Sequence, residues 1–133
     1  MKDGSQLKVA VLSADPKDVE DLRHIIEDGP YRLSVYPDVV QLKAGLKMEA
    51  YIAAILDVDS VSLDNRTIRL LTLDNPGVCF FCTSRDRFHP NLKDAICYHL
   101  FACLQKPVDP DELHYFLKCI RDNEMDSRGP PAR

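Results

Sequence analysis

Short apolar runs, continuous or alternating, are separated along this chain by stretches in which apolar residues recur every three or four positions. The short runs are typical of strands in a buried sheet, and the wider spacing is typical of amphipathic helices. The predicted strands are residues 8–12, 31–36, 51–56, 78–82 and 101–105. The predicted helices carry their apolar positions within residues 19–26, 39–46, 68–71, 90–100 and 113–120.

Helix start and stop signals divide these segments. Asp15-Pro16 and Asp109-Pro110 each combine an N-cap acceptor with a proline at the first helical position, and Pro37-Asp38 opens another helix. Gly29-Pro30 and Asn75-Pro76-Gly77 end helical patterns. Each strand is therefore followed by one helix.

Five strand–helix units in strict alternation predict an α/β fold with a parallel sheet covered by helices on both faces. Right-handed crossovers leave few topologies, and the expected one is the flavodoxin-like strand order 2-1-3-4-5. The 133 residues suit a single domain, which we place at residues 1–122. Residues 123–133 are polar and end in Gly-Pro-Pro-Ala-Arg, which predicts a tail or linker.

The overall composition limits the partners and the compartment that can be expected for this domain. Its formal net charge of −4 gives no electrostatic basis for direct nucleic-acid binding, and no apolar run is long enough to cross a bilayer. The N-terminus lacks the apolar region of a secretion signal. Five cysteines, an odd number lying mostly in apolar stretches, suit buried thiols in a reducing compartment. We expect a cytoplasmic protein without membrane contact.

Chemistry is expected at the carboxyl ends of the strands, where ligands bind in open α/β sheets. The residues there are Ser13-Ala14-Asp15, Asp57, Thr83-Ser84 and Lys106. A carboxylate can act as a nucleophile, an ammonium can neutralise phosphoryl oxygens and a hydroxyl can donate a hydrogen bond. The combination predicts a site for a phosphoryl group.

Three segments at these strand ends resemble the signature motifs of response-regulator receiver domains of two-component systems. They are Tyr51 to Asp57, Phe81 to Ser84 and Leu104 to Pro107, within a resemblance that covers residues 8–121. The resemblance implies that Asp57 accepts a phosphoryl group and that Thr83 and Lys106 hold the phosphoryl oxygens. It implies a signalling switch that at most assists its own phosphorylation and dephosphorylation, and is not otherwise an enzyme.

The same resemblance implies the partners. A histidine kinase or a phosphotransfer protein would donate the phosphoryl group. An output domain or partner protein would contact the face formed by the fourth helix, fifth strand and fifth helix, and a homodimer is an alternative.

The sequence departs from the family at the expected metal site. The family carries two acidic residues after its first strand, and the matching positions here are Ser13 and Ala14. The remaining candidate ligands for Mg²⁺ are Asp57, Asp59 and Asp15, although the position of Asp15 before a proline favours a helix N-cap. Magnesium is usually held through protein carboxylates. We therefore expect its binding to be weak or lost.

Further departures concern the switch. The loop at residues 58–63 lacks the usual proline, His99-Leu100 replaces a pair of small residues, and Cys103 stands where the family has an aromatic switch residue. These changes favour an alternative hypothesis: a pseudo-receiver that serves as a protein-interaction module without phosphorylation.

Two other interpretations are disfavoured. Cys79 and Cys82 form a Cys-x-x-Cys pair, but residues three apart in a strand point to opposite faces, so neither a redox nor a zinc site is expected. The histidines, His24, His89, His99 and His114, are scattered. A nucleotide-binding or flavodoxin-like enzyme would need a glycine-rich loop after the first strand, and residues 13–16 contain no glycine.

Overall fold

The computed structural model describes residues 7–85, 100 and 102–126. Its strands are β1 (Leu7–Leu12), β2 (Tyr31–Tyr36), β3 (Ala53–Asp57), β4 (Cys79–Ser84) and β5 (Ala102–Gln105). Its helices are α1 (Pro16–Glu27), α2 (Val39–Met48), α3 (Asn65–Asp74) and α5 (Pro110–Asp126). The helix predicted within residues 90–100 lies outside the described residues, apart from Leu100.

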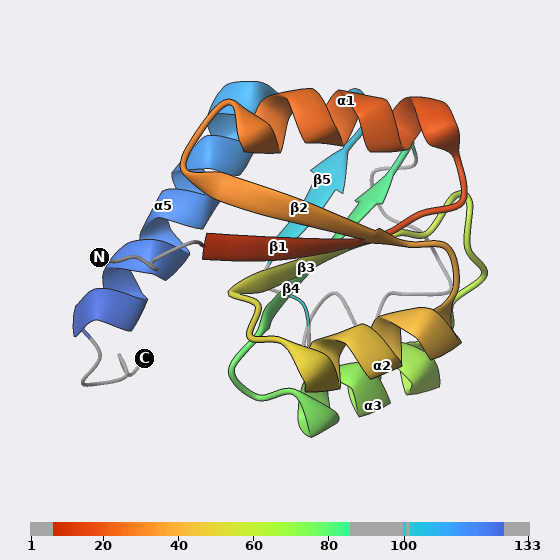
Figure 1. The fold of residues 1–133 in the computed structure, drawn as a ribbon. Helices are drawn as coiled ribbons and strands as arrows, with labels where there is room; N and C mark the ends of the chain where they lie inside the picture. Colours follow the sequence, from red (N-terminus) through yellow and green to blue (C-terminus); the bar gives the residue numbers. More distant parts are fainter. Residues whose placement is uncertain (1–6, 86–99, 101, 127–133) are drawn as a thin grey trace.

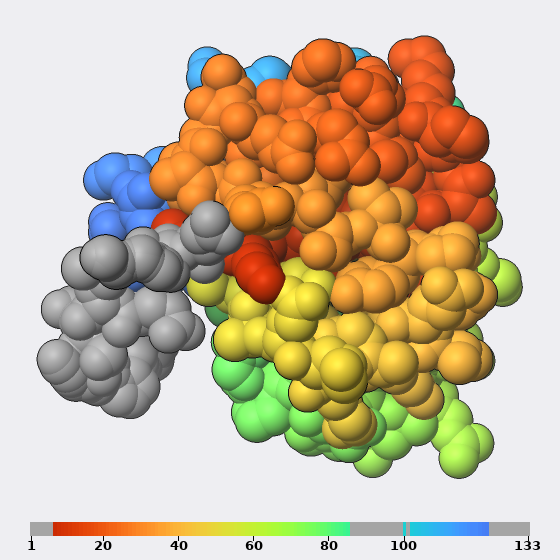
Figure 2. Space-filling model, viewed as in Figure 1, coloured from red at the N-terminus to blue at the C-terminus, as the bar shows by residue number. Residues whose placement is uncertain are grey.

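The strands form one parallel sheet in the order β2-β1-β3-β4-β5, which confirms the predicted fold class and topology. The central strands are continuously apolar because both of their faces are covered. Val9 to Leu12 of β1 and Ala53 to Leu56 of β3 are all fully buried. From the side that Figure 2 shows, α1, β2 and α2 hide nearly all of β1.

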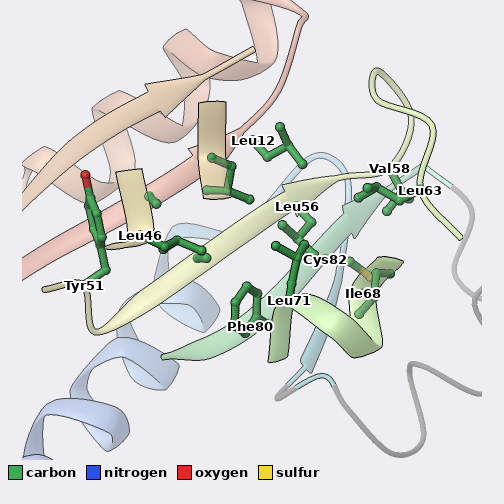
Figure 3. Packing of buried hydrophobic residues seen from close by; sticks show 13 residues of the cluster. Leu12, Leu46, Tyr51, Leu56, Val58, Leu63, Ile68, Leu71, Phe80 and Cys82 are labelled. Atoms are coloured by element: carbon green, nitrogen blue, oxygen red, sulfur yellow. The ribbon is translucent and has the colours of Figure 1, made fainter. Parts of the chain in front are cut away.

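Helices α1 and α5 pack on one face of the sheet, and α2 and α3 pack on the other (Figure 1). The first face buries Leu22 and Ile26 of α1 against Leu113 and Leu117 of α5 and the inward residues of the strands. Figure 3 shows the second face, where Phe80 lies beside Leu71 in one buried cluster that also contains Leu56 and Ile68. None of the described helices is long and apolar enough to span a membrane.

Aspartates cap the four described helices, and at α5 the Asp109 side chain accepts from the Asp111 backbone N–H at 2.9 Å. Asp15, Asp38 and Asp64 accept backbone hydrogen bonds from Lys17, Gln41 and Thr67, and so satisfy N–H groups that have no partner inside the helix. The cap at Asp15 confirms the role that its place before Pro16 predicted. Helix α5 continues to Asp126, into the polar segment after residue 122, and residues 127–133 are not described.

Tyr51 differs from the sequence-based expectation because it lies before β3 and not within it. Its hydroxyl lies 2.7 Å from the hydroxyl of Tyr36, and the two rings pack edge to face. The ring and hydroxyl of Tyr36 lie against Gly45 of α2. A methyl group at Gly45 would overlap the Tyr36 hydroxyl and ring.

We expect Gly45→Ala to destabilise the protein, by about 1–3 kcal/mol as other overpacked substitutions do. This reverses the usual gain from replacing glycine by alanine within a helix. Urea unfolding measures the effect. Gly77→Ala is the matched control, since a methyl group there would meet nothing within 4 Å, and it should leave stability equal or slightly higher. Equal stability of the two variants would contradict the packing of Tyr36 against Gly45.

Candidate functional site

Parallel pairing brings the predicted site residues to one edge of the sheet. Asp57 is the last residue of β3 and is the register partner of Thr83 in β4. Ser13 follows β1, and Lys106 follows β5 and donates its backbone N–H to the Ser84 carbonyl at 2.9 Å. The sheet order therefore gathers residues that are up to 93 positions apart in the sequence, from Ser13 to Lys106.

The Asp57 carboxylate is fully buried and both of its oxygens accept hydrogen bonds. Oδ1 accepts from the Lys106 ammonium at 2.7 Å and from the Asp59 backbone N–H at 3.1 Å. Oδ2 accepts from the Ser13 hydroxyl at 2.8 Å and from the Ser60 hydroxyl at 2.9 Å. A buried charge needs such donors to offset its loss of hydration. The contacts explain how a carboxylate can end a buried strand.

These contacts also keep the side chains of Asp57 and Lys106 charged. Burial raises the pKa of Asp57, but hydrogen bonds from Lys106, Ser13 and Ser60 outweigh it and hold the pKa below the ordinary 3.8. Burial lowers the pKa of Lys106, while its hydrogen bonds to Asp18 and Asp57 raise it, and the net result lies above the ordinary 10.5. At neutral pH the site therefore holds a carboxylate and an ammonium ion.

The Lys106 ammonium contacts three carboxylates. It lies 2.6 Å from Asp18 Oδ2, 2.7 Å from Asp57 Oδ1 and 3.2 Å from Asp59 Oδ2. The Lys106 side chain is only 8% exposed. Sequence reasoning missed Asp18, because an acidic residue in the first turn of a helix is already explained by the helix dipole.

Two loops close over the Asp57 side chain. Ser60 accepts a hydrogen bond from the Ala14 backbone N–H at 2.9 Å and lies 3.3 Å from the Ser13 hydroxyl. Ser60 therefore ties the loop after β3 to the loop after β1. Sequence reasoning missed this residue as well, since a serine three positions after a strand is common in turns and carries no other signal.

Asp59 is held by the end of β4. Its oxygens accept from the Ser84 hydroxyl at 3.1 Å and from the Arg85 backbone N–H at 2.8 Å. Burial raises the pKa of Asp59, and the contacts with Arg85 and Lys106 lower it below its ordinary value overall. Asp59 and Lys106, both predicted to lie near Asp57, thus belong to one charged network.

Thr83 stands apart from this network. Its side chain is 1% exposed, and its hydroxyl has no hydrogen-bond partner among the described residues. An unsatisfied buried hydroxyl costs about 1–3 kcal/mol. Thr83 and Lys106 line a cavity of about 720 Å³, together with Asp18, Leu22 and Arg85. An acceptor oxygen of a bound group would satisfy the Thr83 hydroxyl.

The residues present do not fit a magnesium ion. Asp15 caps α1, and no hydrogen bond or ion pair joins its side chain to Asp57 among the described residues. Ser13 donates to Asp57, and Ala14 has no ligand atom in its side chain. Asp59 is occupied by Ser84, Arg85 and Lys106. In the part of the chain that is described, no three acidic, cysteine or histidine side chains form a metal-binding group.

The remaining candidates are two cysteines of β4 and the histidines, of which His24 lines the same cavity as Thr83 and Lys106. Cys79 and Cys82 pack on opposite faces of the sheet, which confirms that the Cys-x-x-Cys pair diverges. His24 lies on α1 near Glu20, and His114 lies on α5 near Gly29. The other two histidines, His89 and His99, fall outside the described residues.

Acid should lower the stability of the folded protein through protonation of Asp57. The unfolded chain binds a proton at this carboxyl at higher pH than the folded chain, so the stabilisation is complete above about pH 5 and is lost as pH falls through the lower folded pKa. We expect the melting temperature of Asp57→Asn to fall less steeply than that of the wild type between about pH 5 and pH 3. Parallel slopes would show that the hydrogen bonds do not lower the pKa of Asp57.

Removal of the ammonium should destabilise the network at neutral pH. We expect Lys106→Met to cost about 3–5 kcal/mol in urea unfolding, since buried carboxylates lose their counter-ion. Adding Asp57→Asn to that variant should recover part of the loss. Lys17→Met is the matched control, because the Lys17 side chain is 82% exposed in its pair with Asp21 and should change stability by less than about 1 kcal/mol. A loss in Lys106→Met no larger than in the control would refute the network.

Two solved structures of receiver domains share this fold. The signal receiver domain of an HD domain-containing protein from Pseudomonas fluorescens Pf-5 superimposes with a TM-score of 0.82 and 16% identity, over 96% of each chain. The receiver domain of the sensor histidine kinase PA1611 from Pseudomonas aeruginosa PAO1, which has a magnesium ion coordinated in its active site cleft, gives a TM-score of 0.73 and 16% identity, over 86% of this chain and 97% of that one.

A putative pilus assembly protein (cpaE) from Burkholderia thailandensis E264 is similar too, with a TM-score of 0.74 and 25% identity, over 88% of this chain and 99% of that one. No protein-family profile and no curated protein matches the chain. Strand order, helix placement and these neighbours agree: the chain has the receiver-domain fold that its sequence motifs predict.

Proposed function

We propose that this chain is a receiver-type domain of two-component signalling that acts as a protein-interaction module without phosphorylation. The observation that carries this proposal is the position of the Lys106 ammonium among the carboxylates of Asp18, Asp57 and Asp59. A lysine held by three carboxylates supplies internally the positive charge that a metal ion would otherwise bring.

The state of Asp57 supports this proposal. To attack a phosphorus atom, a carboxylate oxygen must be reachable and must give up its hydrogen bonds. Asp57 is fully buried, and its Oδ2 accepts from both Ser13 and Ser60. The charge that develops on a transferring phosphoryl group is commonly neutralised by a metal ion. Ser13 and Ala14 offer no carboxylate to hold one.

The partners follow from the same proposal. An output domain or partner protein would bind the face that includes β5 and α5, and a kinase would not be needed to set its state. Tyr115 on α5 is 64% exposed and Phe116 beside it is partly buried against the sheet. A module of this kind catalyses no reaction of its own.

Thr83 favours a second candidate, a receiver that accepts a phosphoryl group on Asp57. In that reaction an Asp57 oxygen attacks the phosphorus of a phosphohistidine, and the bond between phosphorus and the histidine nitrogen breaks. Lys106 would neutralise the phosphoryl oxygens, and the unpartnered Thr83 hydroxyl would donate a hydrogen bond to one of them. This candidate requires Ser13 and Ser60 to release the carboxylate.

Acetyl phosphate distinguishes the two candidates. We expect no phosphoryl adduct in the intact mass of the full chain, with or without Mg²⁺, while circular dichroism shows it to be folded. Introducing the acidic pair as Ser13→Asp with Ala14→Asp should produce a Mg²⁺-dependent adduct that disappears when Asp57→Asn is added. An adduct on the unmodified chain that Asp57→Asn abolishes would overturn the proposal and establish the second candidate.

A further inference from the structure

Two cysteines face one another across neighbouring strands. Cys82 of β4 and Cys103 of β5 are register partners, and their sulfur atoms lie 3.0 Å apart. Both are free thiols. Neighbouring strands run about 4.8 Å apart, which falls within the Cα separation of about 4.4–6.8 Å that a disulfide requires. The backbone therefore needs little movement to accommodate a bond between them.

The two thiols have different surroundings. Cys82 is fully buried beside Leu71 and Ile68, as Figure 3 shows, and Cys103 is half-buried at the border of the same cluster. The Cys82 thiol donates a hydrogen bond to the Cys103 sulfur. This bond lowers the pKa of Cys103 in spite of its burial, and the same bond, together with burial, raises the pKa of Cys82.

This asymmetry suits a reactive thiol pair, in which one thiol reacts with the oxidant and the other reacts in a second step. The thiolate is the attacking species, so the more accessible residue with the lower pKa reacts first. Cys103 fulfils both conditions, and Cys82 stays protonated beside it until a second step needs it. The pair thus combines proximity, alignment and unequal acidity.

We propose that Cys82 and Cys103 form a redox modification site at which a peroxide converts the two thiols into a disulfide between β4 and β5. The Cys103 thiolate attacks one oxygen of hydrogen peroxide, the O–O bond breaks, and the departing hydroxide takes up a proton to become water. Cys103 is left as a sulfenic acid. The Cys82 sulfur then loses its proton and attacks the Cys103 sulfur, and the S–O bond breaks to release a second water. Two thiols lose two electrons, and one peroxide becomes two waters.

The bond would lie next to the candidate functional site. Cys82 directly precedes Thr83, and Cys103 lies three residues before Lys106. The Lys106 backbone N–H already bonds to β4 through the Ser84 carbonyl. A covalent link between these strands would therefore act on the ends that position Thr83 and Lys106. The proposal does not depend on whether Asp57 is phosphorylated.

The test uses a full-length variant, Cys79→Ser with Cys97→Ser and Cys119→Ser, which retains only this pair. After treatment with hydrogen peroxide, the remaining thiols are alkylated in denaturant and the intact mass is measured. We expect the loss of both alkylatable thiols in a monomer, with full recovery after dithiothreitol. Adding Cys103→Ser should leave Cys82 alkylatable under the same conditions.

A control distinguishes disulfide formation that depends on the folded arrangement from formation by chance encounter of the two thiols. The same variant unfolded in urea should form the disulfide more slowly, because its two cysteines are then held together only by a flexible loop. Two thiols that survive peroxide in the folded protein would overturn the proposal. So would a disulfide-linked dimer, an irreversible sulfinic acid at Cys103 with Cys82 reduced, or equal rates in folded and unfolded protein.

Discussion

The burial of a negative charge at the end of β3 is the constraint on which this structure depends. β3 is the middle strand of the sheet, and its last residue is an aspartate with no exposed surface. A carboxylate in that position is stable only if hydrogen bonds and opposite charge replace the water it loses. The donors are Ser13, Ser60 and Lys106, and Lys106 in turn requires the carboxylates of Asp18 and Asp59.

The same contacts limit the chemistry of the site. Each hydrogen bond that stabilises Asp57 occupies an oxygen that a phosphoryl donor would need to reach. The neighbouring Thr83 shows the opposite condition, because its hydroxyl is buried without a partner in the described part of the chain. A group bound between Asp57 and Thr83 could accept a hydrogen bond from the Thr83 hydroxyl and replace some of the hydrogen bonds of the Asp57 carboxylate. Receiver domains at 16% identity share this fold, so the arrangement of sheet and helices tolerates wide changes in sequence.

Much of the fold was accessible from local patterns. Apolar runs located the strands, and the dipeptide Asp15-Pro16 located the start of α1, because strand burial and helix capping act over a few neighbouring residues. The strand ends then predicted that Asp57 and Lys106 would meet. The apolar run predicts Tyr51 within a strand, whereas the structure places it before β3, where its hydroxyl pairs with Tyr36. Periodicity alone could not detect that difference.

The sequence by itself determined the order of the elements, the residues at the strand ends and the absence of the usual acidic pair at Ser13 and Ala14. Only the tertiary structure decided that Asp18 reaches Lys106, 88 positions away, and that Cys82 meets Cys103. The reason is physical: hydrophobic period and capping are local, so they can be read along the chain. Contacts between distant side chains depend on register and on packing, which are settled by all the elements together.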